Sequence, residues 1–155
     1  MLVKNEASTY PIAYIPCDLA RDNLVLSLIA KGFCAGDKAY FAMFGITQYL
    51  SHDEFEALVA SVAKLSCTGT ALAFDYQSTQ DKKINALANG AGETMENIYG
   101  DEYVFETLRK NGFRIYELMN SNDIEQTYFE RYNQIYPEKE MKLQGNLNLV
   151  LAVKK

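Results

Sequence analysis

The chain has 155 residues, enough for one domain with its own core, and its 48% hydrophobic and 23% charged residues are ordinary for a soluble globular protein. Its formal net charge of −5, without any lysine- or arginine-rich block, disfavours nucleic-acid binding, which requires neutralisation of phosphates. No apolar run approaches the ~20 residues of a membrane-spanning helix, and the early Glu6 is untypical of a signal peptide, so we expect a cytoplasmic protein with neither a nucleic-acid nor a membrane partner.

Three cysteines, Cys17, Cys34 and Cys67, are spread over the first half of the chain. Their number is odd, their spacing is wide, and no C-x-x-C pair occurs. This pattern predicts neither a disulfide framework nor a metal site, and it fits a reducing compartment.

The first predicted strand, Ile12–Ile15, leads through Pro16 and Cys17 to Asp18 and Leu19. A helix over Arg21–Lys31 follows, because leucines recur at helical spacing and Gly32 marks its end. Ligands of α/β proteins lie outside the carboxyl ends of strands, so an acidic residue at this junction is a candidate for holding the adenine of a cofactor. Taken alone, Asp18 is better explained as a helix cap or a first-turn charge than as a cofactor contact.

Three further elements are predicted up to residue 76. Ala39–Phe44 is an uncharged apolar run, typical of a strand buried on both faces. Ser51 and Glu54 form a capping-box pattern at the start of a helix whose apolar residues lie on one face. Thr70–Tyr76 is the next strand, uncharged until its carboxyl end.

The second half has a polar stretch and then alternates again. We interpret residues 77–100 as a possible lid, followed by a helix over Asp101–Lys110 that Asn111-Gly112 ends. The remaining predicted elements are a strand at Phe113–Met119, helical structure at Ser121–Asn133 and a last strand at Leu147–Val153. The alternation predicts a single α/β domain over residues 1–155, with an open, mostly parallel sheet and helices on both faces.

Four segments in order carry a resemblance to a known family: Tyr14-Ile15-Pro16-Cys17-Asp18-Leu19, Lys31-Gly32-Phe33, Gly45-Ile46-Thr47-Gln48-Tyr49-Leu50, and Gly69-Thr70 through Phe74-Asp75-Tyr76. They resemble the later half of class I S-adenosylmethionine-dependent O-methyltransferases of the leucine carboxyl methyltransferase and polyketide O-methyltransferase group. The resemblance implies a Rossmann-like, mostly parallel sheet with an antiparallel last strand.

The same resemblance implies roles at the site. Asp18 and Leu19 would hold the adenine of S-adenosylmethionine, and the strand before Gly45 would reach the cofactor. Phe44 stands where many family members carry a glutamate. The implied reaction is methyl transfer to a carboxylate or hydroxyl of a small molecule.

One feature of the family is absent from this sequence. The family's first half supplies a glycine-rich turn and an acidic ribose-binding residue, and the G-x-G of this sequence, Gly90-Ala91-Gly92, does not qualify as that turn because no predicted strand leads into it. We therefore expect a partial methyltransferase domain that lacks two strands between Ile12–Ile15 and Ala39–Phe44. Its open strand edges favour a homodimer or a complementing chain. The alternative is a non-catalytic remnant or interaction module.

His52 and the tyrosines Tyr49 and Tyr76 each have a structural interpretation as well as a functional one. His52 lies in the first turn of a capped helix, so we expect a solvated surface residue rather than a base. Methylation of a carboxylate needs no base, because that acceptor is already ionised at neutral pH. Tyr49 and Tyr76 fit either a substrate pocket or packing at the sheet ends.

Overall fold

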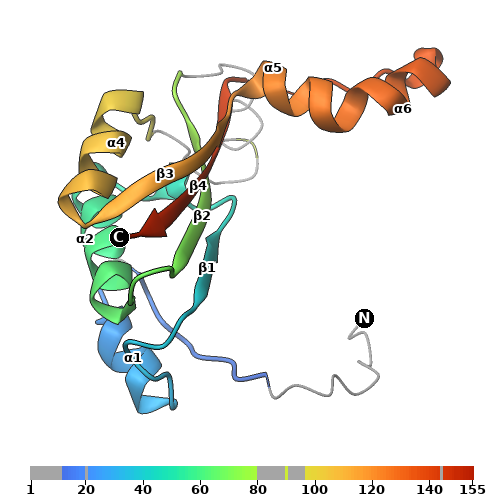
Figure 1. The fold of residues 1–155 in the computed structure, drawn as a ribbon. Coiled ribbons are helices and arrows are strands. Elements are labelled where there is room, and N and C mark those ends of the chain that lie inside the picture. Colours follow the sequence, from blue (N-terminus) through green and yellow to red (C-terminus); the bar gives the residue numbers. More distant parts are fainter. Residues whose placement is uncertain (1–11, 20, 80–89, 91–96, 144) are drawn as a thin grey trace.

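A computed structural model of the chain describes residues 12–19, 21–79, 90, 97–143 and 145–155. Its helices are α1 (Leu24–Ala30), η1 (Thr47–Tyr49), α2 (His52–Leu65), α4 (Asp101–Lys110), α5 (Ser121–Ile124), η2 (Glu125–Phe129), α6 (Glu130–Ile135) and η3 (Pro137–Lys139). Its strands are β1 (Tyr40–Met43), β2 (Ala71–Gln77), β3 (Phe113–Met119) and β4 (Leu147–Lys154) (Figure 1). Most of the predicted lid, at residues 80–89 and 91–96, lies outside the described residues.

The four described strands form one mixed sheet in the order β1-β2-β4-β3. Strand β1 pairs with β2 in parallel, while β4 runs antiparallel to both of its neighbours, β2 and β3. Strands β1, β2 and β3 therefore share one direction, and their carboxyl ends lie at the same edge of the sheet. The predicted α/β class and the antiparallel last strand are confirmed.

Helix α2 forms where the sequence predicts it, because its first turn is satisfied locally. The Glu54 amide donates to the Ser51 hydroxyl at 3.3 Å, and the Ser51 amide donates to the Glu54 carboxylate at 2.7 Å. The helix then buries five apolar side chains on one face, namely Phe55, Leu58, Val59, Val62 and Leu65. This capping box and single apolar face fix both the start of the helix and its orientation on the sheet.

The core lies between helices α2 and α4 and one face of the sheet. From β2 it receives Leu72, Phe74 and Tyr76, all of which are fully buried. The Phe55 ring of α2 lies 5.5 Å from the Phe74 ring, centroid to centroid. Strand β4 contributes alternate residues to the same face, as the period of a half-buried strand requires.

The prediction of a strand at Ile12–Ile15 is wrong. Residues 12–18 have no regular secondary structure, and 59% of Ile12 and 83% of Tyr14 are exposed. An apolar run becomes a strand only if another strand supplies hydrogen-bond partners, and among the described residues no strand lies beside this one. The predicted helix after it is shorter than expected, at Leu24–Ala30, with Asn23 as its cap.

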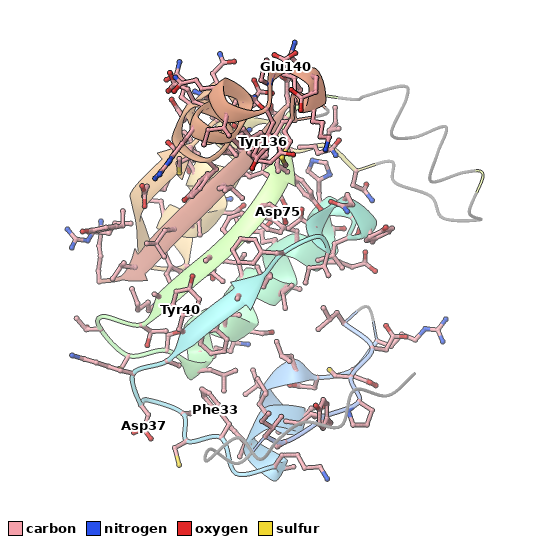
Figure 2. The ribbon with its side chains drawn as sticks, turned by 90° about the vertical axis from the view of Figure 1, so that its right-hand side faces the viewer. Phe33, Asp37, Tyr40, Asp75, Tyr136 and Glu140 are labelled. Carbon is pink, nitrogen blue, oxygen red and sulfur yellow. The ribbon has the colours of Figure 1, made fainter. Side chains whose placement is uncertain are left out.

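The opposite face of the sheet is only partly covered by the described helices. Figure 1 shows α1, α2 and α4 on one side of the sheet and the segment from α5 to α6 extending to the other, where Tyr128 of η2 lines a pocket with Tyr40 and Phe44. The prediction of helices that cover both faces therefore holds, among the described residues, for one face and only at one end of the other. The predicted strand Ala39–Phe44 is likewise not buried on both faces, since 63% of Tyr40 and 54% of Phe44 are exposed. Figure 2 looks onto this second face, with Tyr40 and Asp75 on it. We call it the open face.

The helical connection after β3 extends away from the sheet (Figure 1). It begins at a second capping box, in which the Asn120 side chain accepts from the Asp123 amide at 3.1 Å. It continues through a π-helical turn, η2, into α6, and so covers the predicted range Ser121–Asn133 with two residues more. A shift of register in β3 between Ile115 and Glu117 precedes it.

Candidate functional site

The carboxyl ends of β1 and β2 are joined by the side chain of Asp75. The amide of Gly45, just after β1, donates to the Asp75 carboxylate at 2.7 Å. The Thr47 hydroxyl donates to the Asp75 carbonyl oxygen at 2.6 Å. Gly45 has a φ of +71°, a conformation that glycine adopts without steric cost. A Cβ added at this glycine would meet no heavy atom within 4 Å, so open space lies beside the turn.

Asp75 is a candidate site residue that the sequence analysis did not select. Burial raises the pKa of its carboxyl group above the usual value, and the hydrogen bond from the Gly45 amide opposes that rise. The sequence carries one signal for it, an acidic residue near the carboxyl end of an otherwise apolar strand. Its partner lies 30 residues away, so only the pairing of β1 with β2 reveals the contact.

Asp18 and Leu19 lie in a turn that leads into α1. The carbonyl oxygen of Asp18 accepts hydrogen bonds from the amides of Arg21 and Asp22, at 3.1 and 2.7 Å. The Asp18 amide donates to the Asp22 carboxylate at 2.7 Å, and Arg21 lies 3.6 Å from the Asp18 carboxylate. Asp18 does not cap α1, because Asn23 does. Leu19 packs against the hydrophobic core.

The structure places the two predicted cofactor-binding pairs, Asp18-Leu19 and Phe44-Gly45, on separate segments. Hydrogen bonds from Ser51 hold the pKa of Glu54 below its usual value, and the negative charge of Asp18 acts in the opposite sense. Asp18 therefore lies within electrostatic range of Glu54 in the first turn of α2. That turn follows shortly after Phe44 and Gly45. The adenine-binding role of these residues stays a prediction.

An aromatic cluster supports the η1 turn that follows Gly45. The Tyr99 ring is fully buried, and its hydroxyl donates to the carbonyl oxygens of Thr47, at 2.9 Å, and Leu50. His52 is exposed and lies against two rings, 4.9 Å from Tyr99 and 4.7 Å from Tyr103 between centroids. Burial raises the pKa of the Tyr99 hydroxyl, so it remains a donor at neutral pH. Tyr99 is a second residue that the sequence analysis missed.

The two tyrosines singled out from the sequence differ in environment. Tyr76 is fully buried, and its hydroxyl donates to the Asp101 carboxylate at 2.7 Å, so it packs between β2 and α4. Tyr49 is 43% exposed at the end of η1. In the described part of the chain, no group of three or more His, Cys, Asp or Glu side chains is arranged to hold a metal ion.

Part of the chain is similar in sequence to known methyltransferases. The sequence model of the leucine carboxyl methyltransferase family matches residues 2–63, which include Asp18, Leu19, Phe44 and Gly45. A putative S-adenosyl-L-methionine-dependent methyltransferase of Bacillus subtilis, YktD, is 22% identical over 126 residues, which are 75% of this chain. The matched part is 41% of the length of that relative.

Solved structures share the fold at low sequence identity. The magnesium protoporphyrin IX methyltransferase of Synechocystis PCC 6803, solved with bound SAH, superposes with a TM-score of 0.52 at 12% identity, over 90% of this chain and 49% of that one. The geranyl diphosphate C-methyltransferase of Streptomyces coelicolor A3(2) gives a TM-score of 0.52 at 12% identity, over 80% of this chain and 50% of that one.

These comparisons confirm the resemblance to S-adenosylmethionine-dependent methyltransferases over part of the chain. The structural neighbours establish a Rossmann-like fold, and the chain spans about half the length of these relatives. A search of the described helices finds none with the length and apolarity that crossing a membrane would require.

Proposed function

We propose that this chain forms the later half of an S-adenosylmethionine-dependent O-methyltransferase that methylates a carboxylate or hydroxyl group of a small molecule. One observation carries the proposal: the family match includes Phe44 and Gly45, at the carboxyl end of β1, where ligands of such sheets bind. The hydrogen bond from the Gly45 amide to Asp75 fixes that end against β2.

The residues present suit one part of the cofactor. The Asp18 side chain is 52% exposed and offers an acceptor for the amino group of adenine, while Leu19 supplies an apolar contact beside it. The exposed ring of Phe44 offers an aromatic face, and Gly45 leaves room for a close approach of ligand to backbone. The described residues therefore fit the adenine half of the ligand.

Bound S-adenosylmethionine supplies an activated methyl group on a sulfonium centre. The contribution of this chain is to bind and orient. The Asp75 carboxylate holds the Gly45 turn, the Tyr99 hydroxyl holds η1, and both fix the backbone next to the cofactor. Transfer to a carboxylate acceptor, which is already ionised, needs alignment more than proton removal, so that reaction requires no base from this chain.

A complementing polypeptide would supply the rest of the cofactor site. The one G-x-G of the sequence, Gly90-Ala91-Gly92, follows no predicted strand and so does not match the glycine-rich turn that would hold the methionine part. Strand β1 is the last described strand on its side of the sheet, and Tyr40 within it and Phe44 just after it are largely exposed. Exposed strand edges and apolar faces recruit partners. These features support pairing with a complementing chain or a second copy.

The same features favour a second candidate, a non-catalytic interaction module that keeps the sheet without binding the cofactor. The two candidates differ in whether the exposed Asp18 carboxylate contacts ligand. For both candidate functions we place the chain in the cytoplasm, because its three free cysteines fit a reducing compartment.

Transfer of a labelled methyl group tests the proposal. The chain is mixed with a polypeptide that carries the segment of the Bacillus subtilis relative not covered by this chain, together with labelled S-adenosylmethionine and a panel of small carboxylic acids and phenols. We expect label in an acceptor only when both polypeptides are present, and less of it with Asp18→Ala. Formation of the complex without any transfer or cofactor binding would instead favour the interaction module.

A further inference from the structure

A polar pocket of about 260 Å³ has neither Asp18 nor Gly45 in its lining. Its lining includes Ser78, just after β2, and Asn120, just after β3, with Asn146 and Asn148 at the start of β4. Asp101, Ser121 and Asn122 complete it. Since β2 and β3 run in the same direction, the pocket lies at the carboxyl edge of the sheet. A water molecule takes about 30 Å³ of liquid volume, so the space admits a small molecule.

Asn148 is the residue that points to a ligand. Only 7% of it is exposed, and its side-chain nitrogen has no hydrogen-bond partner among the described residues. A buried amide donor without a partner costs about 1–3 kcal/mol, so native structures rarely leave one unpaired. The donor therefore calls for an acceptor atom inside the pocket.

Other polar groups of the lining are already engaged with the protein. The Ser121 hydroxyl lies 3.2 Å from the Gly145 carbonyl and 3.1 Å from the Leu147 carbonyl. The Asn120 side-chain oxygen accepts from two backbone amides of α5. These contacts hold the walls in place, so the pocket is formed before any ligand enters.

The negative charge of the lining indicates the charge that a ligand can carry. Among the described residues, Asp101 is the only charged side chain of the lining, and the hydrogen bond that its carboxylate accepts from them comes from Tyr76 at 2.7 Å. A carboxylate has about four acceptor positions, so Asp101 has room for a donor from the ligand. A second anion would meet this negative charge in a chain whose net charge is already −5.

We propose that this pocket binds a small amino alcohol or polyol. A hydroxyl oxygen of the ligand accepts from the Asn148 side-chain nitrogen, and an ammonium or hydroxyl group donates to Asp101. The proposal does not depend on the proposed methyltransferase function, because all of the lining residues belong to this chain.

Side-chain amide resonances of the ¹⁵N-labelled chain test the proposal, with ethanolamine, glycerol and acetate as probes. The pair of resonances that Asn148→Leu removes identifies the Asn148 amide. We expect this pair to shift saturably with ethanolamine and with glycerol and to stay unmoved with acetate. Asp101→Asn should weaken ethanolamine binding about tenfold, the factor that ~1.4 kcal/mol represents, and leave glycerol binding nearly unchanged.

Two controls separate binding from folding. Asn148→Leu removes an unpaired buried donor, so its free energy of unfolding should equal or exceed that of the natural chain. Asp37→Asn changes the same charge in a turn outside the pocket and should leave ethanolamine binding intact. The proposal is overturned if neither ethanolamine nor glycerol moves the Asn148 resonances, which would mean a site for water alone, or if acetate moves them equally.

Discussion

The amide of Gly45 donates a hydrogen bond of 2.7 Å to the carboxylate of Asp75. This contact joins the turn after β1 to the neighbouring strand β2. It also gives a structural role to an acidic side chain in a strand whose other residues are mostly apolar. The geometry of the proposed cofactor edge therefore depends on a residue outside the segment that the family model matches.

Replacing Asp75 by alanine should destabilise the fold by about 1–3 kcal/mol, because the change removes the acceptor of a charge-assisted hydrogen bond. Chemical denaturation measures this loss. Asp75→Asn is the matched control, since an amide oxygen still accepts from the Gly45 amide. Equal stability of the alanine and asparagine variants would show that the hydrogen bond contributes little.

The same residue predicts a pH dependence. Burial raises the pKa of Asp75 in the fold above its usual value of 3.8, so around that pH the folded state binds more protons than the unfolded state. The contribution of Asp75 to stability is therefore full below the unfolded pKa and is lost as the pH rises through the folded pKa. The difference in unfolding free energy between Asp75→Asn and the natural chain should grow over that window. A difference independent of pH would contradict the raised pKa.

Ser51→Ala should destabilise the chain by about 1 kcal/mol, because the alanine cannot accept from the amide of Glu54 at the start of α2. Thermal or denaturant unfolding measures the change. Ser61→Ala in the same helix is the control: its hydroxyl only donates back to the Ala57 carbonyl, and its loss should change stability by less than ~0.5 kcal/mol. Equal effects of the two substitutions would rule out a special role for the cap.

Without a complementing polypeptide, the chain should self-associate as its concentration rises, because Tyr40 lies exposed on the open face and on an edge strand. Tyr40→Lys should shift the distribution toward monomer in light scattering coupled to size exclusion. Tyr14→Lys, at an exposed tyrosine outside the sheet, should not. A natural chain that stays monomeric at all concentrations would contradict this expectation.

Local signals predicted most of the regular structure. The capping box of Ser51 and Glu54 fixed the start of α2, and the limits of α4 and β3 agree with the predicted ranges. These elements are specified by caps, by glycines and by one apolar face, all of which can be read within a dozen residues.

The failures concern contacts across the chain. The apolar pattern of Ile12–Ile15 does not reveal whether a neighbouring strand is present, and the pattern of β1 does not reveal whether a second layer covers it. Asp75 and Tyr99 were missed as site residues for the same reason, since their partners lie 30 and 52 residues away. Periodicity records how apolar a face is, and only the fold determines what lies against it.

Calorimetric titration with S-adenosylhomocysteine tests the central claim most directly. It is done on the chain alone, on the chain with the complementing polypeptide, and on the same mixture carrying Asp18→Ala. We predict no heat of binding for the chain alone, saturable binding for the mixture, and weaker binding with Asp18→Ala. The account is contradicted if the complementing polypeptide binds S-adenosylhomocysteine alone and its affinity changes neither when this chain is added nor when Asp18 is replaced by alanine.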